Sequence, residues 1–178
     1  MLNEDNRAVF TSWLKEHSAS VFQVARAYTL TSEECQDLAQ EILLQAWQSL
    51  PKFEAKASPA TWFYRVALHT AMNWRRNDRM RREHQRPWLE VQLPEVAANS
   101  GEQAEQRELV EQLYRAIHQL PKTDIALMLL YLDDMSYREM ASVLGISESN
   151  VGVRLNRARQ AITTLLNAAT AEGQSDES

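Results

Sequence analysis

The segment from Ser136 to Gln160 has the residue pattern of a helix-turn-helix, and it constrains the fold more than any other part of the chain. Ser136 and Glu139 have the spacing of a capping box, which starts a first helix. Gly145 follows that helix and suits a tight turn, because glycine adopts positive φ without a steric penalty. Ser147 then suits the N-cap of a second helix. The pattern predicts two helices that cross at the turn, with the second placed to enter the major groove of DNA.

The second of these helices has an apolar face and a polar face. Val151, Leu155 and Ala158 share the apolar face, which we expect to pack on the first helix. The polar side supplies the candidate contacts with duplex DNA: Ser147, Ser149, Asn150, Val153, Arg154, Asn156 and Arg157. An ordinary αα-hairpin in a helical bundle would show the same apolar spacing, so this alternative stays open from the residues alone.

Helical periodicity dominates the remainder of the chain, which favours an all-α fold. The chain has 178 residues, of which 44% are apolar and 24% charged, as is ordinary for a globular protein. We expect two small helical domains joined by a flexible linker, the second being a four-helix domain with the helix-turn-helix. The expected boundaries are 1–86 for the first domain, 87–104 for the linker, 105–170 for the second domain and 171–178 for a disordered tail.

Several features that would indicate other classes of protein are absent from the sequence. No apolar run is long enough to cross a membrane, and the first ten residues lack the build of a signal peptide. A single cysteine, Cys35, cannot form an internal disulfide, so we expect a cytoplasmic protein. There is no phosphate-binding loop and no nucleophile constellation, and the four histidines are dispersed: His17, His69, His84 and His118. We therefore expect no catalytic residue, no metal and no cofactor.

The net charge of −5 is unevenly distributed. The segment from Arg75 to Arg86 holds six arginines and two acidic residues, whereas Glu90 to Glu111 holds six glutamates and one arginine. The segment from 136 to 170 is again mildly basic. A basic block, an acidic connector and a basic carboxyl end suit two DNA contacts joined by a solvated tether.

The segment from Ser58 to about Glu83 is predicted as one long helix that combines aromatic residues with arginines. Ser58 and Pro59 suit its cap and its first position. Four aromatics precede the basic half: Trp62, Phe63, Tyr64 and Trp74. Rings that stack on unpaired bases contribute roughly 1–3 kcal/mol each, and arginines neutralise the backbone, so this helix suits single-stranded nucleic acid. The alternative is that the aromatics form a core, as we expect for Phe63 and one tryptophan, and that the arginines are a solvated face.

The order and spacing of motifs along the chain resemble those of bacterial extracytoplasmic-function sigma factors, a group of RNA polymerase initiation factors. The resemblance runs from about Phe10 to Leu166. It rests on the stretches 37–41 through Trp47, Phe53, 61–67, 120–121, 131–141, 144–147 and 154–158.

The resemblance implies roles for three groups of residues. The helix that would dock on core RNA polymerase carries Asp37, Gln40, Glu41, Gln45 and Trp47. The loop and helix that would capture and melt the minus-ten element carry Lys56, Ser58, Thr61, Trp62, Arg65, His69, Asn73 and Arg76. The second helix of the helix-turn-helix would read the minus-thirty-five element with the polar residues given above.

The resemblance also implies a function and partners. A sigma factor directs core polymerase to promoters by minus-thirty-five binding and minus-ten melting, without nucleotide hydrolysis. The implied partners are core RNA polymerase, promoter DNA as duplex and as melted non-template strand, and an anti-sigma factor, with no membrane insertion. The alternatives are a stand-alone helix-turn-helix regulator and a helical adaptor protein.

The recognition helix departs from the pattern of many relatives. Its first turns read Asn150-Val-Gly-Val153, where many relatives have a lysine or arginine at the position of Gly152. Glycine also weakens a helix interior by about 1 kcal/mol. The minus-thirty-five preference of typical members therefore does not carry over to this chain.

Overall fold

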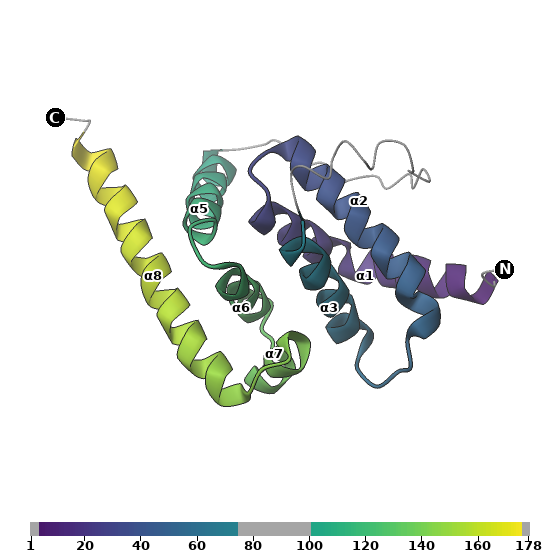
Figure 1. Cartoon of the computed structure of the whole chain (residues 1–178). Helices are drawn as coiled ribbons and strands as arrows, with labels where there is room; N and C mark the ends of the chain where they lie inside the picture. The colour runs from purple at the N-terminus through teal and green to yellow at the C-terminus, as the bar shows by residue number, and fades with distance from the viewer. Residues whose placement is uncertain (1–3, 75–100, 176–178) are drawn as a thin grey trace.

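A computed structural model describes residues 4–74 and 101–175 of the chain. The regular elements in these ranges are all helical (Figure 1). They are α1 (Glu4–Tyr28), α2 (Ser32–Ser49), the 3₁₀ turn η1 (Leu50–Lys52), α3 (Pro59–Met72), α5 (Gly101–Ile117), α6 (Lys122–Leu132), α7 (Tyr137–Leu144) and α8 (Glu148–Ser175). The predicted all-α class is confirmed. The basic block with candidate residue Arg76, and most of the predicted linker, lie outside the described residues.

Helices α1, α2 and α3 form an amino-terminal bundle in which each helix packs on the other two (Figure 1). The start of α2 is capped by Thr31, whose Oγ1 accepts a hydrogen bond of 3.1 Å from the amide of Glu34. Large apolar side chains that are almost completely buried fill the bundle: Val21, Val24, Leu38, Ile42, Phe63 and Leu68. Because these side chains face the inside of the bundle, the remaining faces of α2 and α3 are directed toward solvent or toward the second bundle.

Helices α5, α6 and α7 all pack on α8, and together they form the carboxyl-terminal bundle. Its fully buried residues are Ile117, Leu127, Leu130, Met140, Val151 and Leu155. Helix α8 continues to Ser175, so residues 171–175 are helical and the expectation of a disordered tail from residue 171 is not met there. Residues of good helix propensity dominate this end, and a single glycine, Gly173, does not stop the helix.

Helix α3 ends at Met72, well short of the predicted end near Glu83. The cause is local. The side-chain amide of Asn73 donates a hydrogen bond of 2.8 Å to the carbonyl of His69, and the amide of Trp74 bonds the carbonyl of Ala71 instead of continuing the α-helical pattern. An asparagine that bonds the preceding turn offers the backbone an alternative to further helix.

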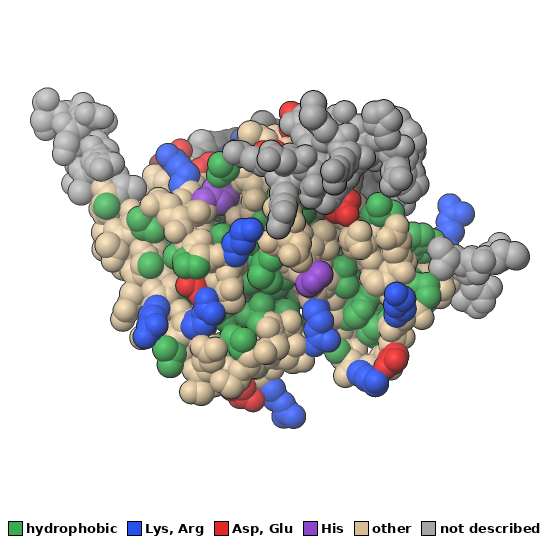
Figure 2. Space-filling model, viewed as in Figure 1, with side chains coloured by type: hydrophobic (Ala, Val, Ile, Leu, Met, Phe, Trp, Pro, Cys, Tyr) green, Lys and Arg blue, Asp and Glu red, His purple; other side chains and the backbone are tan. Residues whose placement is uncertain are grey.

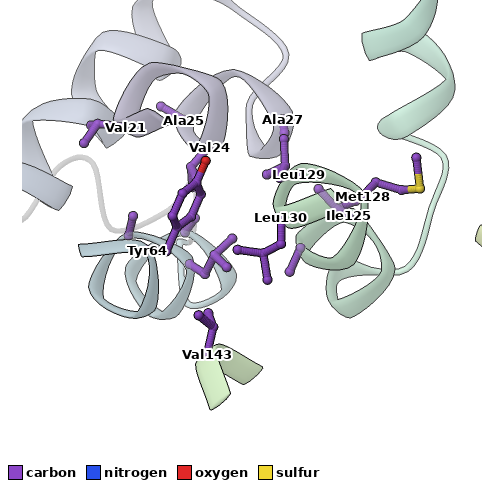
Figure 3. Packing of buried hydrophobic residues seen from close by; sticks show 14 of the residues in the cluster. Val21, Val24, Ala25, Ala27, Tyr64, Ile125, Met128, Leu129, Leu130 and Val143 are labelled. Carbon is purple, nitrogen blue, oxygen red and sulfur yellow. The ribbon is translucent and has the colours of Figure 1, made fainter. Parts of the chain in front are cut away.

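The two bundles pack against each other through α6. Six consecutive residues of α6, Ile125 to Leu130, are buried, because α8 covers one side of the helix while α1 and α3 cover the other. Figure 3 shows Val24 and Tyr64 of the amino-terminal bundle facing Leu129 and Leu130. A helix that is apolar all round must be covered all round, so α6 is the common core element of the two bundles.

Candidate nucleic-acid interface

The helix-turn-helix forms as the sequence predicts. Ser136 Oγ accepts from the amide of Glu139 at 3.3 Å, and the Glu139 carboxylate accepts from the amide of Ser136 at 2.8 Å, which completes the capping box. Hydrogen bonds from the Ser136 hydroxyl and amide hold the pKa of the Glu139 carboxyl below its ordinary value. Gly145 has φ of 68° and ends α7 in the left-handed conformation. These contacts set the crossing of α7 and α8.

The predicted apolar and polar faces of the recognition helix are both found in α8. Val151, Leu155 and Ala158 are buried. Ser147 caps the helix, because its Oγ accepts from the amide of Asn150 at 3.2 Å. Six of the candidate contacts with duplex DNA are exposed: Ser147, Ser149, Asn150, Val153, Asn156 and Arg157. Their roles in DNA binding stay predictions.

Arg154, the seventh candidate, is turned toward the protein. Its Nε and Nη2 atoms both donate to Asp124 Oδ1 of α6, at 2.9 and 2.7 Å. The side chains are 32% and 17% exposed. A partly desolvated guanidinium with two bonds to one carboxylate is a strong contact. Arg154 thus fixes α8 on α6 in this structure, which adds a structural role to the predicted one.

Asp124→Ala is expected to lower the free energy of unfolding by about 1.5–3 kcal/mol, since it removes a carboxylate that accepts two charge-assisted hydrogen bonds. Urea denaturation followed by circular dichroism measures this change. Arg154→Ala should cost a similar amount, and the double variant little more than either single variant. Arg154→Lys is the matched control, because it keeps the charge but loses the planar two-nitrogen geometry. Additive costs of the two alanine substitutions would contradict a direct pair.

The candidate minus-ten residues divide between the surface and the start of α3. Lys56, Ser58, Arg65, His69 and Asn73 are exposed, and Lys56 forms an ion pair with Glu54. Ser58 caps α3, since its Oγ accepts from the amide of Thr61 at 3.1 Å and also lies 2.9 Å from Thr61 Oγ1. Thr61 is only 6% exposed, so its contacts here are structural. Figure 2 shows Lys and Arg side chains spread over both bundles on one face of the molecule, where acidic side chains are sparser.

Trp62 lies partly buried in an aromatic cluster that anchors the loop before α3. The cluster consists of Trp13 of α1, Phe53 after η1, and Trp62. The ring centroids are 5.0 Å apart for Trp13 and Phe53, 5.6 Å for Trp13 and Trp62, and 5.5 Å for Phe53 and Trp62. All three pairs are edge-to-face, the favourable arrangement for aromatic rings. The sequence singled out Trp62 and Phe53 but did not reveal that Trp13 joins them.

Comparison with known proteins places this architecture in a family. Sigma-70 region 2 matches residues 13–81, and sigma-70 region 4 matches residues 110–162. RNA polymerase sigma factor YlaC of Bacillus subtilis (strain 168) is 31% identical over 138 residues, which are 71% of this chain and 74% of YlaC. The chain is a sigma factor of the extracytoplasmic-function group. As such it directs RNA polymerase to promoters, and the predicted family and function are confirmed.

Other relatives extend the likeness of this sigma factor to nearly the whole chain. RNA polymerase sigma factor CnrH of Cupriavidus metallidurans is 26% identical over 175 residues, covering 92% of this chain and 89% of CnrH. The structure of CnrH in complex with the cytosolic domain of CnrY has a TM-score of 0.62 at 22% identity and covers 91% of this chain and 90% of that chain. Sigma factor RpoE from Bartonella quintana, in complex with the anti-sigma factor NepR, has a TM-score of 0.62 at 18% identity and covers 89% and 96%. These structures share the fold.

The candidate polymerase-binding residues of the sigma factor lie along α2. Gln40 and Gln45 are exposed, whereas Asp37, Glu41 and Trp47 are half-buried. The side-chain amide of Gln45 donates to Glu41 at 3.0 Å, and the Trp47 ring packs edge-to-face on Phe10 at 5.1 Å. Trp47 therefore serves the core of the bundle while part of it remains accessible.

Polar contacts join the two bundles of the sigma factor at α7 and at the start of α6. Arg65 of α3 donates to the backbone carbonyl of Ser142 in α7 at 2.7 Å and approaches its hydroxyl at 3.3 Å. Lys122 donates to the carbonyl of Met72 at 3.1 Å, and Tyr28 donates to the carbonyl of Lys122 at 2.6 Å. Burial raises the pKa of Tyr28 far above its ordinary value, so the hydroxyl remains a donor. We call these contacts, with the apolar packing around α6, the interdomain contact.

A second part of the interdomain contact involves Arg26 of α1. Its guanidinium pairs with Glu111 of α5 and lies over the ring of Tyr114, with 4.1 Å from Cζ to the ring centroid. The backbone carbonyl of Arg26 accepts from Nε2 of His118 at 2.9 Å. The sequence did not predict these pairs, because their members lie 85 and 92 residues apart.

Two absences concern residues 4–74 and 101–175, the part of the chain that the structure describes. No set of three or more His, Cys, Asp or Glu side chains there could hold a metal ion. Among the described helices, none combines the length and apolar character that a membrane crossing requires.

Proposed function

We propose that this sigma factor binds core RNA polymerase through α2, opens the minus-ten element with α3, and holds the duplex minus-thirty-five element with α8. The proposal rests on two polar surfaces, one in each bundle. One surface is on α3 and the loop before it, and the other is on the recognition part of α8. The protein would act in the cytoplasm beside polymerase, without a metal, a cofactor or a catalytic step of its own.

Run-off transcription tests this proposal. Core polymerase is incubated with a library of promoter fragments, with and without the purified chain, and the transcripts are sequenced. We expect transcripts that start at defined positions only when the chain is added. If the chain protects particular duplexes from nuclease but yields no transcript with core polymerase, it is a stand-alone regulator. If it does neither, it is a helical adaptor.

Asn73→Ala is expected to slow open-complex formation about tenfold, which corresponds to about 1.4 kcal/mol, if Asn73 contacts a captured base. Stopped-flow fluorescence of a labelled promoter measures the rate. Because Asn73 also ends α3 through its bond to His69, the melting temperature must be measured in parallel. A normal rate, or a slow rate accompanied by an equal loss of polymerase binding, would show that Asn73 acts only as a helix cap.

Promoter binding would require the interdomain contact to open. The minus-ten and minus-thirty-five elements are named for their positions, which differ by about 25 base pairs. This separation is about 85 Å along a duplex that rises about 3.4 Å per base pair. In this structure α3 and α7 touch, and Arg65 of the minus-ten surface is bonded to Ser142 of the helix-turn-helix. We propose that the structure is a closed form that cannot span both elements.

We also propose that an anti-sigma factor holds this chain inactive. The support is the shared fold with RpoE, which was solved with the anti-sigma factor NepR. The test is to add a candidate partner to the run-off assay and to measure transcription against partner concentration. Stoichiometric inhibition that an excess of the chain reverses would support the proposal, and binding without inhibition would refute it.

A further inference from the structure

The centre of the recognition surface on α8 is apolar. Ser149, Gly152, Val153 and Asn156 fall on one face of the helix, because residues three and four apart are neighbours. Val153 is 51% exposed, so it projects from the surface without filling the core. Between Ser149 and Asn156 this face has no charged side chain of its own.

Tyr137 of α7 occupies the space above Gly152. A β-carbon at position 152 would lie 3.4 Å from Cε2 and 3.9 Å from Cδ2 of the Tyr137 ring, which is ordinary van der Waals contact, so the ring lies beside this position. The ring is itself 45% exposed. A long side chain at 152 would have to pass this ring. The aromatic ring of Tyr137 from the first helix thus stands beside Gly152 on the surface of the second.

Neither Gly152 nor Val153 is explained by helix stability. Glycine in a helix interior costs about 1 kcal/mol relative to alanine, and a β-branched valine loses side-chain freedom. Both stand in the first two turns of α8, where polar residues of better propensity would serve a merely solvated face. Since Val153 does not fill the core, its exposed apolar side chain requires another explanation.

The arginine that follows Val153 in the sequence is directed elsewhere. Arg154 donates to Asp124 of α6 from two of its nitrogens, so in this structure it does not extend over Gly152 and Val153. In this structure the recognition surface therefore does not receive from Arg154 the guanidinium that would donate to guanine O6 and N7. Its hydrogen-bonding groups, Asn150, Asn156 and Arg157, lie around the apolar centre.

The C5 methyl of thymine is the apolar group that base pairs present in the major groove. We infer that Tyr137, Gly152 and Val153 form an apolar contact for a thymine methyl group in the minus-thirty-five element and thereby set the sequence preference of this sigma factor. The inference rests on the proposed binding of that element by α8. It adds Tyr137 and Gly152 to the specificity-determining residues.

The test uses holoenzyme and a promoter selected by it from a randomised minus-thirty-five region. Each thymine in the selected element is replaced singly by deoxyuridine, which lacks only the methyl group, and holoenzyme affinity is measured by titration. At one or two positions we expect affinity to fall about fourfold, the effect of exposing one buried methyl. The same change should be without effect for the Val153→Ser holoenzyme, whose affinity for the thymine promoter starts correspondingly lower.

Two controls separate this contact from general effects. Leu109→Ser removes an apolar side chain that is 64% exposed on α5, and its holoenzyme should keep the full sensitivity to deoxyuridine. Gly152→Lys, which introduces a long charged side chain beside the Tyr137 ring, should reduce that sensitivity as Val153→Ser does. Circular dichroism confirms that each variant is folded before it is compared.

The outcomes distinguish this inference from the proposed function. If randomised minus-thirty-five regions yield no preferred sequence, α8 does not read the element and the proposed function fails. If a preferred sequence emerges but holoenzyme affinity is the same for thymine and deoxyuridine at every position, the methyl contact alone is wrong. Sensitivity to deoxyuridine that persists in the Val153→Ser holoenzyme also overturns it.

Discussion

Cross-linking position 65 to position 142 is expected to abolish promoter-dependent transcription, and cutting the cross-link should restore it. Arg65 and Ser142 are hydrogen-bonded across the interdomain contact, which joins α3, the proposed minus-ten helix, to the helix-turn-helix. A covalent bridge at this point holds the two proposed DNA-reading surfaces side by side. The promoter elements are separated by about 85 Å of duplex, so the bridged protein cannot reach both.

The experiment combines Arg65→Cys and Ser142→Cys in a background with Cys35→Ser, which removes the single native cysteine. A short bismaleimide with a reducible disulfide in its spacer forms the bridge. Run-off transcription is measured before and after reduction of the same sample, so the loss of Arg65 affects both measurements equally. We expect transcript to fall to the level of core polymerase alone and to return on reduction.

Single-cysteine variants treated with the same reagent provide the control for chemical modification of either position. They should retain the activity of their untreated forms. A bridged protein that still transcribes from the full promoter would show that promoter engagement does not need the interdomain contact to open. Loss of activity that reduction does not reverse would indicate damage by the reagent, and the bridge must then be repeated with a different spacer chemistry.

Replacing Trp62 with alanine is expected to destabilise the amino-terminal bundle by about 3 kcal/mol, the lower end of the range for a large aromatic residue in a core. The indole contacts Trp13 and Phe53 edge-to-face, so its loss leaves a cavity and also releases the loop that begins at Phe53. We therefore expect slow open-complex formation as a consequence of the displaced loop. Urea denaturation and the rate of open-complex formation are measured on the same preparations.

Trp62→Phe separates packing from base contact. Phenylalanine keeps an aromatic ring in the cluster, so most of the stability should return and the loop should stay in place. Recovery of both stability and the rate of open-complex formation would assign Trp62 a structural role. Recovery of stability with a rate that stays low would assign the indole a direct contact with the melted strand.

The sequence was informative wherever the deciding interactions lie within a few residues of each other. The capping box of Ser136 and Glu139, the left-handed turn at Gly145 and the burial of Val151 and Leu155 all follow from spacings of three to six residues. Helical periodicity and hydrogen-bonding groups at such spacings favour a helix or its end before any tertiary contact forms. The domain order and the likeness to sigma factors rest on these same local patterns.

The sequence was less informative about helix ends. The predicted helix from Ser58 to about Glu83 ends at Met72, and residues 171–175 are helical where a disordered tail was expected. Helix ends depend on competition between similar hydrogen bonds, such as the choice of His69 carbonyl as partner of the Asn73 side chain. Propensity alone does not resolve a competition of this kind.

The sequence holds one signal of the tertiary arrangement. The run Ile125 to Leu130 has no polar residue, whereas a helix in a small four-helix domain needs a solvent-facing stripe. An uninterrupted apolar helix predicts burial on every side. Here α8 covers one side of α6, and the amino-terminal bundle covers the other. The partner of that surface could not be deduced, because burial requires an apolar surface but does not specify which one.

The sequence by itself determined the helices, the two bundles and the helix-turn-helix, because these depend on local spacing and on amphipathic periodicity. Only the tertiary structure decided which candidate side chains face outward. It joined Arg154 to Asp124, Arg65 to Ser142, and Tyr137 to Gly152. A side chain contacts the group that folding brings nearest to it. In these three pairs the two partners lie 15 to 77 residues apart in the sequence. No local pattern encodes such a distance, so the surface that meets DNA became defined only after the chain had packed.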